Sequence, residues 1–215
     1  MSDDKNLMQA VIDELNWEPS VDSANIGVTA KGGVVTLMGH VGSYSEKYAA
    51  ERAARRVKGV KAIAEEIEVK LPLGVKRGDE EIAAAAIARL SWDAAVPSDA
   101  VKVKVEKGWV TLTGQVEWHY QHKAAADDIR NLWGVTGISN LITINSKPNA
   151  SNIRQDILAA LHRSWFDPGT IKVTVNDGKV DLTGTVDDWG KWSIAQSTAW
   201  AAPGITSVVN HIQVH

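Results

Sequence analysis

The chain has 215 residues, of which 44% are hydrophobic and 23% are charged, and its formal net charge is −3. This composition is ordinary for a globular protein and excludes disordered, collagen-like and membrane-spanning chains. Without a basic field, nucleic acid is not an expected partner. The chain has no cysteine, so neither disulfides nor a thiolate nucleophile are available.

The N-terminal segment predicts the location of the protein. Residues 1–6 are acidic and polar, and residues 7–15 read as an amphipathic helix. A secretory signal requires a basic start and a continuous apolar stretch. We therefore expect a cytoplasmic protein, free or peripheral at the inner membrane, with no transmembrane segment.

Glycines reveal three internal copies of one unit. In each of three sets, the members are 75 and then 70 residues apart, and one set lies inside the pattern Leu-x-Gly-x-Val. Three landmarks in register predict tandem repeats. The sets are Gly39, Gly114 and Gly184; Gly33, Gly108 and Gly178; and Gly59, Gly134 and Gly204.

Each copy has the same order of hydrophobic patterns. In the first copy, apolar residues share a helix face over 7–15, alternate over 26–30 and 35–41, share a helix face over 50–57, and alternate over 63–69. A glycine turn between the two alternating segments predicts a β-hairpin. The patterns recur at 82–90, where Ile87 is expected on the buried face, 101–105, 110–116, 125–132 and 138–144, and again at 153–161, 171–175, 180–186, 195–202 and 208–214.

This order predicts an α+β fold of three tandem α-β-β-α-β domains. The hairpin makes the first two strands antiparallel, and the helical crossover returns the third strand parallel to the second. We expect in each domain a mixed three-stranded sheet with two helices on one face. The predicted domains, called repeats 1, 2 and 3 below, are residues 1–71, 77–145 and 149–215, and the linkers are 72–76 and 146–148, each with one proline.

Single positions carry further expectations. Asp79 precedes the first helix of repeat 2, and Ser151 precedes the first helix of repeat 3. Both are expected to be N-caps. The inward glycines of the Gly39 set should let the second helix approach the sheet closely. Asn140 and Asn210 occupy the position of Glu65 and can bond local backbone.

The element order, the Leu-x-Gly-x-Val pattern and the closing Gly-Val-x-x-Ile/Val-x-Asn-x-Ile pattern resemble the BON domain, named from bacterial OsmY and nodulation proteins. The resemblance covers nearly the whole chain, three times over. It implies a link to osmotic and envelope stress and to the binding of phospholipid surfaces. The chain departs from familiar stress members, which carry two copies and an export signal.

No constellation typical of an enzyme is evident. The chain has no phosphate-binding loop and no nucleophile elbow, and its serines and carboxylates do not recur at one position. His119 and His122 could share a helix face and ligate a metal, but solvated histidines are the favoured interpretation because no third ligand is evident nearby. No cofactor is expected.

Basic residues gather on the second helix of repeat 1. They could face the phosphates of anionic lipid, or they could be a solvated face balanced by Glu46, Glu51, Glu65 and Glu66, which is the favoured interpretation. The anionic-lipid candidates are Arg52, Arg55, Arg56 and Lys58.

Nine tryptophans stand against a single phenylalanine. Trp17, Trp92 and Trp165 follow the first helix of each repeat and are expected to be structural lids over the core edge. Trp200 is expected on the outward face of its helix, and exposed tryptophans usually mark an interface. The candidates for contact with protein or membrane are Trp189, Trp192, Trp200, Trp118 and Trp133.

The leading hypothesis is a non-enzymatic binding or scaffold protein, related to osmotic or envelope stress, that self-associates or contacts another protein through aromatic helix faces. A peripheral phospholipid-binding protein is the first alternative. A small-ligand or potassium sensor is the second.

Overall fold

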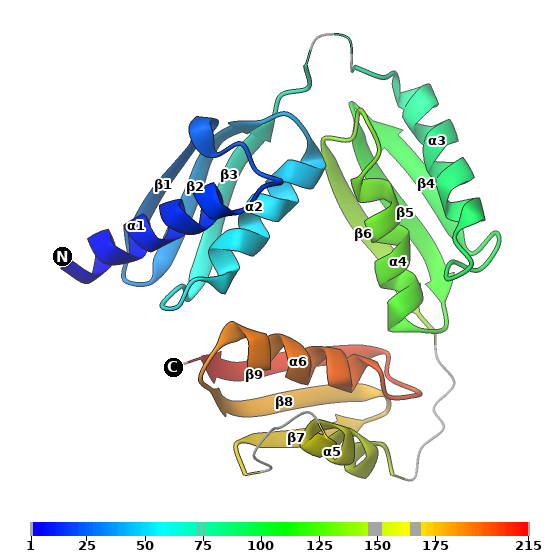
Figure 1. The fold of residues 1–215 in the computed structure, drawn as a ribbon. Coiled ribbons are helices and arrows are strands. Elements are labelled where there is room, and N and C mark those ends of the chain that lie inside the picture. The colour runs from blue at the N-terminus through cyan, green and yellow to red at the C-terminus, as the bar shows by residue number, and fades with distance from the viewer. Residues whose placement is uncertain (1, 73, 75, 146–151, 164–168, 215) are drawn as a thin grey trace. The chain divides into compact units, whose positions relative to one another are not determined.

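The computed structural model describes residues 2–72, 74, 76–145, 152–163 and 169–214. Figure 1 shows three units of like architecture, each built from a three-stranded sheet and two helices. The predicted α+β class and the three-fold repetition are confirmed.

Repeat 1 contains the elements that the apolar patterns predict. They are α1 (Ser2–Trp17), β1 (Ile26–Lys31), β2 (Val34–Val41), α2 (Tyr44–Arg56) and β3 (Ala62–Val69), with one short 3-10 turn at Ser23–Asn25 before β1.

Repeats 2 and 3 follow the same order. Repeat 2 has α3 (Asp79–Trp92), β4 (Val101–Glu106), β5 (Trp109–Val116), α4 (His119–Arg130) and β6 (Gly137–Ile144). Repeat 3 has α5 (Ile153–Arg163), β7 (Ile171–Asn176), β8 (Lys179–Val186), α6 (Trp189–Trp200) and β9 (Ser207–Val214).

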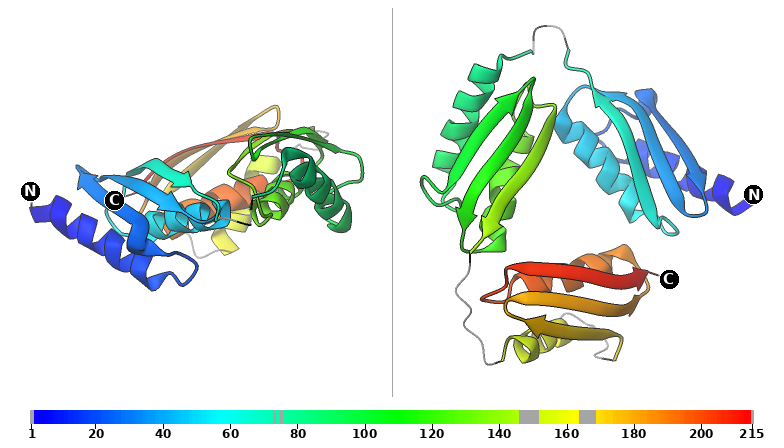
Figure 2. Two further views of the ribbon diagram at one scale, coloured as in Figure 1. Left: turned by 90° about the horizontal axis from the view of Figure 1, so that it is seen from above. Right: turned by 180° about the vertical axis from the view of Figure 1, so that it is seen from behind.

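The second strand lies in the middle of every sheet. In repeats 1 and 3 the hairpin strands pair antiparallel, and the second and third strands pair parallel. A right-handed helical crossover between parallel strands produces this mixed sheet. Figure 2 shows β4–β6 and β7–β9 with their helices behind them, so the helices cover one sheet face and the other stays open.

The core of each repeat lies between the sheet and its helices. Alternate residues of the strands point inward, and Leu37, Leu112 and Leu182 at the centres of β2, β5 and β8 are completely buried. Small residues on the second helices, such as Ala50 and Ala195, are also completely buried. Ile87 is 61% exposed, so its predicted place on the buried face of α3 is wrong. Helix α3 buries the narrower stripe of Ile82, Ala86 and Leu90, as the spacing i, i+4, i+8 permits.

The hairpin turns have the backbone that the sequence predicts. Two turn residues with positive φ match the twist of the flanking strands, and the pair Lys107–Gly108 has φ of 52° and 79°. Gly108 is also pressed against the chain after α4, because an added Cβ would lie 2.6 Å from the carbonyl oxygen of Gly134. The other turns match, with φ of 60° and 86° at Gly32 and Gly33, and 46° and 77° at Asp177 and Gly178.

The inward strand glycines serve a close approach of backbone, but not of the second helix as expected. Gly39, Gly114 and Gly184 have φ of 117°, 139° and 139°. A Cβ on Gly39 would overlap the carbonyl oxygen of Asn25, the residue that precedes β1. The backbone that approaches each glycine is therefore the segment that enters the first strand. A residue with a side chain at this position would leave no room for it.

Carboxylates at the start of the first helices hold the hairpin turns. Asp4 accepts a hydrogen bond from the Gly32 amide at 2.7 Å, and Asp79 accepts from the Lys107 and Gly108 amides at 2.8 and 2.9 Å. Asp79 is thus not the N-cap that the sequence predicts.

Gly78 has that place, since its amide donates to Glu81 and its carbonyl accepts from Ile82. The N-cap is the residue that precedes the helix, and α3 already begins at Asp79. Ser151, the other predicted N-cap, lies outside the described residues.

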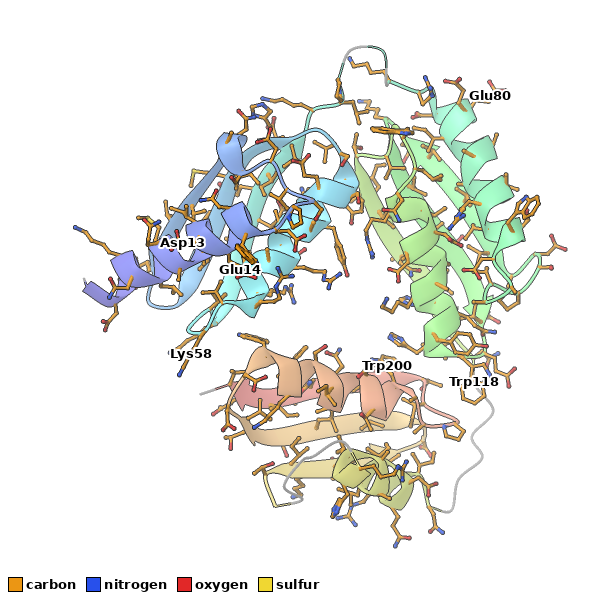
Figure 3. All side chains as sticks on the ribbon, in the orientation of Figure 1. Asp13, Glu14, Lys58, Glu80, Trp118 and Trp200 are labelled. Carbon is orange, nitrogen blue, oxygen red and sulfur yellow. The ribbon has the colours of Figure 1, made fainter. Side chains whose placement is uncertain are left out.

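We expect Asp79→Ala to lower the stability of repeat 2 by about 1–2 kcal/mol, because two charge-assisted hydrogen bonds are lost at an exposed site. Amide exchange at Lys107 and Gly108 and the thermal midpoint would measure the change. The control is Glu80→Ala, which removes a neighbouring carboxylate that points away from the hairpin (Figure 3). Equal shifts for the two variants would show that charge at the helix start, and not the tie to the turn, determines stability.

Candidate interaction site: exposed tryptophans at repeated positions

Two of the most exposed large side chains occupy the same position in repeats 1 and 2. Trp17 ends α1 and Trp92 ends α3, and they are 83% and 87% exposed. The expectation that these residues are lids over the core is therefore wrong. Each follows a buried leucine, Leu15 or Leu90, by two residues, and residues two apart on a helix point to different faces. Both helices continue through the tryptophan, which keeps it turned away from the sheet.

The basic side chains near these tryptophans are paired with carboxylates. Near the end of α1, Arg56 donates to Glu14 and Glu18 at 2.9 Å each, and the bond from Arg56 lowers the pKa of the Glu18 carboxyl. Near the end of α3, Arg89 pairs with the buried Asp128 at 2.9 Å. One guanidinium faces two carboxylates near the end of α1, and one faces one carboxylate near the end of α3. A contact at these positions would therefore meet an aromatic ring and paired charges, not a cationic field.

Trp165, the predicted counterpart in repeat 3, lies outside the described residues. The remaining candidates of repeat 2 differ in exposure. Trp133, in the turn after α4, is 62% exposed. Trp118 is half-buried before α4 (Figure 3), and its amide donates to Gln121 at 2.9 Å.

The tryptophans of α6 are all partly buried, in contrast to the outward face expected for Trp200 (Figure 3). Trp192 and Trp200 pack against the core of repeat 3. Trp192 precedes the buried Ala195 and Ala199 by three and seven residues, and this spacing defines one helix face. Trp189 and Trp192 contact each other edge to face, with ring centroids 5.4 Å apart.

Trp109 is an exposed tryptophan that the sequence interpretation did not single out. It opens β5, is 48% exposed, and donates from its indole nitrogen to Ser139 at 2.9 Å. A side chain added at Gly137 would overlap its ring. The alternation of β5 places residue 109 on the open face of the sheet, and that pattern could have identified it.

The basic residues of α2 are partly neutralised. Arg55 pairs with Glu51 at 2.6 Å, and Arg56 pairs with Glu14 and Glu18. Arg52 and Lys58 are exposed. The four residues therefore present less positive charge than their number indicates.

A histidine pair and a surface hollow were also considered as ligand sites. The rings of His119 and His122 stack with centroids 5.6 Å apart, but in the described part of the chain no three His, Cys, Asp or Glu side chains gather where they could hold a metal ion. An open hollow of about 610 Å³ lies beside the start of α1. Its lining includes Lys58 and Asp4, and the Asp4 carboxylate is already bonded to Gly32.

A model of the BON domain matches residues 3–70, 78–146 and 149–215, nearly the whole chain. The chain belongs to the BON domain family. The resemblance on which the sequence interpretation depended is thereby confirmed. Over the described residues of this BON-domain protein, every helix is too short or too polar to traverse a lipid bilayer.

A characterised protein has a similar sequence. The BON-domain chain is 30% identical over 127 residues to osmotically-inducible protein Y of Escherichia coli K12, a match that covers 55% of this chain and 63% of that protein. It therefore spans less than two thirds of the length of that relative.

Two solved structures of CdsD, described as a structural protein of the type III secretion system of Chlamydia trachomatis, are 18% and 16% identical. Each match covers 98% of this chain, and 92% and 98% of theirs. With TM-scores of 0.28 and 0.27, they add nothing to the argument.

Proposed function

We propose that this BON-domain protein is a non-enzymatic binding protein that associates with protein surfaces, first of all with further copies of itself, through Trp17 and Trp92. The observation that carries the proposal is the recurrence of a tryptophan more than four-fifths exposed at one position in two repeats. Large exposed aromatic rings are costly in water and are enriched at protein interfaces.

The charges favour a protein partner over an anionic membrane. Near both tryptophans the guanidinium groups of Arg56 and Arg89 are paired with carboxylates, whereas attraction to anionic lipid requires clustered basic residues. The likeness to an osmotically-inducible protein supports a role under osmotic or envelope stress. In that role the protein would act as a scaffold whose contacts form when its concentration rises.

The test is light scattering behind size exclusion over a range of protein concentrations. We expect a wild-type mass that rises above the 23.2 kDa of one chain and returns to it in the double variant Trp17→Ser/Trp92→Ser. The substitutions are at exposed sites, so the variant should stay folded. The matched control is Ile87→Ser, which also removes an exposed apolar side chain from α3. The residue at the corresponding position of repeat 1 is less exposed, so Ile87 is not part of the repeated feature.

A wild type that remains monomeric at every concentration would reject self-association. A double variant with the wild-type mass would reject the tryptophans as the contact.

Phospholipid binding is the second candidate, favoured by the exposed Arg52 and Lys58. Flotation with anionic vesicles at low salt would support it if binding were lost in Arg52→Ser/Lys58→Ser, and absence of flotation would end it. The hollow beside α1 leaves a small-ligand or potassium sensor as the third candidate. No thermal shift across a panel of salts and metabolites would argue against that role.

A further inference from the structure

Each sheet has two edge strands, the first and the third, whose outer sides carry backbone groups that no neighbouring strand of the sheet bonds. In repeat 1 the edge strand β3 pairs with β2 on one side, where the amides of Ala62 and Lys70 donate to Gly33 and Val41. Successive residues of a strand direct their backbone groups to opposite sides. The amide and the carbonyl of Ile67 therefore both point to the free edge.

Two side chains of repeat 1 bond both of these groups. Glu65 accepts a hydrogen bond from the Ile67 amide through Oε1 at 2.7 Å. Lys47, on α2, donates from Nζ to the Ile67 carbonyl at 2.6 Å. The Lys47 Nζ and the Glu65 Oε2 also lie 2.8 Å apart, and the two side chains are only 22% and 25% exposed. The ion pair thus holds both side chains in position to bond the amide and the carbonyl of Ile67.

The other repeats retain half of this arrangement. Asn140 accepts from the Ile142 amide at 3.3 Å, and Asn210 accepts from the Ile212 amide at 3.0 Å. Where repeat 1 has Lys47, repeats 2 and 3 have His122 and Trp192, which carry no ammonium group to reach the edge carbonyl.

A first strand shows the same kind of bond. In β7, Val173 lies three residues before the end of a strand that leads into a two-residue hairpin turn. Its backbone groups therefore point away from β8, by the alternation of antiparallel pairs. Arg154, on α5, donates from Nε to the Val173 carbonyl at 3.0 Å. Side chains from the covering helices thus reach edge carbonyls in two of the three sheets.

We infer that Lys47 and Glu65 form an edge cap, which prevents the third strand of repeat 1 from pairing with a strand of another molecule. An exposed strand edge is a template for association, and proteins block it with side chains that occupy its backbone groups. The cap lies at the Ile67 position of β3, so a strand added there would have to displace a shielded ion pair. Repeats 2 and 3 have the bond to the amide of Ile142 or Ile212 but no lysine at the position of Lys47.

Amide exchange measured by NMR on the full chain tests the cap without any substitution. In the wild type we expect the Ile67 amide to exchange at least about tenfold more slowly than the amide of Ile63, which faces the same edge, because a hydrogen bond to a charged group must open first. Equal protection of the two amides, after correction for intrinsic rates, would overturn the inference.

Variants then assign the cap to Glu65. Glu65→Ala should raise the Ile67 exchange rate to that of Ile63, and Glu65→Gln, which keeps an acceptor, should restore slow exchange. Glu66→Ala is the matched control, since it removes a carboxylate from the opposite face of β3. Protection of the Glu68 amide, which faces β2, reports that the strand remains folded. An unchanged Ile67 rate in folded Glu65→Ala would reject the assignment.

The double variant Lys47→Met/Glu65→Met tests the purpose of the cap. We expect its apparent mass in light scattering to exceed that of the wild type at equal concentration, because both backbone groups of Ile67 become available. The control Lys61→Met/Glu66→Met changes the charge equally and leaves the cap intact. A folded double variant with the wild-type mass at every concentration would show that the cap does not prevent strand pairing.

Discussion

Gly39→Ala is expected to lower the free energy of unfolding of repeat 1 by about 3 kcal/mol or more. Two costs act together. The φ of 117° is one that residues with a Cβ rarely adopt, and the new methyl group would overlap the Asn25 carbonyl oxygen. Relief would require the entry to β1 to move away from β2, which breaks the register of Ile26 opposite Gly39.

Gly32→Ala provides the matched control within the same repeat. Gly32 also has a positive φ, of 60°, but a Cβ there would meet no atom within 4 Å. We expect a loss of about 1 kcal/mol, from backbone strain alone. Denaturant unfolding combined with amide exchange in β1 and β2 would measure both variants. Similar losses would mean that the close approach to Asn25 contributes nothing.

Leu112→Ala is expected to cost about 2–5 kcal/mol, because it leaves a cavity in the centre of a core that excludes solvent completely. Leu141→Ala removes the same atoms from the open face of the same sheet, where the side chain is 61% exposed. Its effect should stay within about 0.5 kcal/mol. Residue-resolved amide exchange is the suitable measurement, since a chain of several units need not unfold in one step.

This experiment also tests the proposed division of the chain. If residues 1–71, 77–145 and 149–215 each form a folding unit, Leu112→Ala should lower the protection of amides in β4, β5 and β6 only. Loss of protection in β2 and β8 to the same degree would show that the repeats unfold together.

The sequence predicted the fold because three copies of each signal reinforce one another. A single Leu-x-Gly-x-Val pattern is weak, but its recurrence at Gly39, Gly114 and Gly184 showed that the strand pattern of one repeat applies to all three. The pattern could not show which segment of the chain packs against the glycine. That depends on the φ of the glycine and on where the chain enters the first strand, and neither leaves a mark in the hydrophobic periodicity.

The tryptophans were harder to place because exposure at a helix end depends on where the helix stops. With Leu15 taken as the last helical residue, Trp17 could fold back over the core. With two further residues in helical conformation it points away. On α6, a count of apolar spacing back from Ala199 would have placed Trp192 toward the core.

The edge cap was accessible from the sequence only in part. The shared place of Asn140 and Asn210 indicated a bond to local backbone, and the structure confirms it. Glu65 makes the same bond in repeat 1. Lys47 was not considered, because it lies eighteen residues earlier in the chain and on another element. An aligned comparison of positions 47, 122 and 192 would have shown that only repeat 1 pairs a lysine with its glutamate.

The difference at these two positions also bears on assembly of the chain as it is synthesised. Three units with one strand order could exchange third strands while they fold, a typical error of tandem arrays. A third strand from repeat 1 that docked in repeat 3 would place Glu65 beside Trp192, where no cation compensates the carboxylate. The pair of Lys47 and Glu65 would therefore favour the pairing of β3 with its own sheet over pairing with repeat 3.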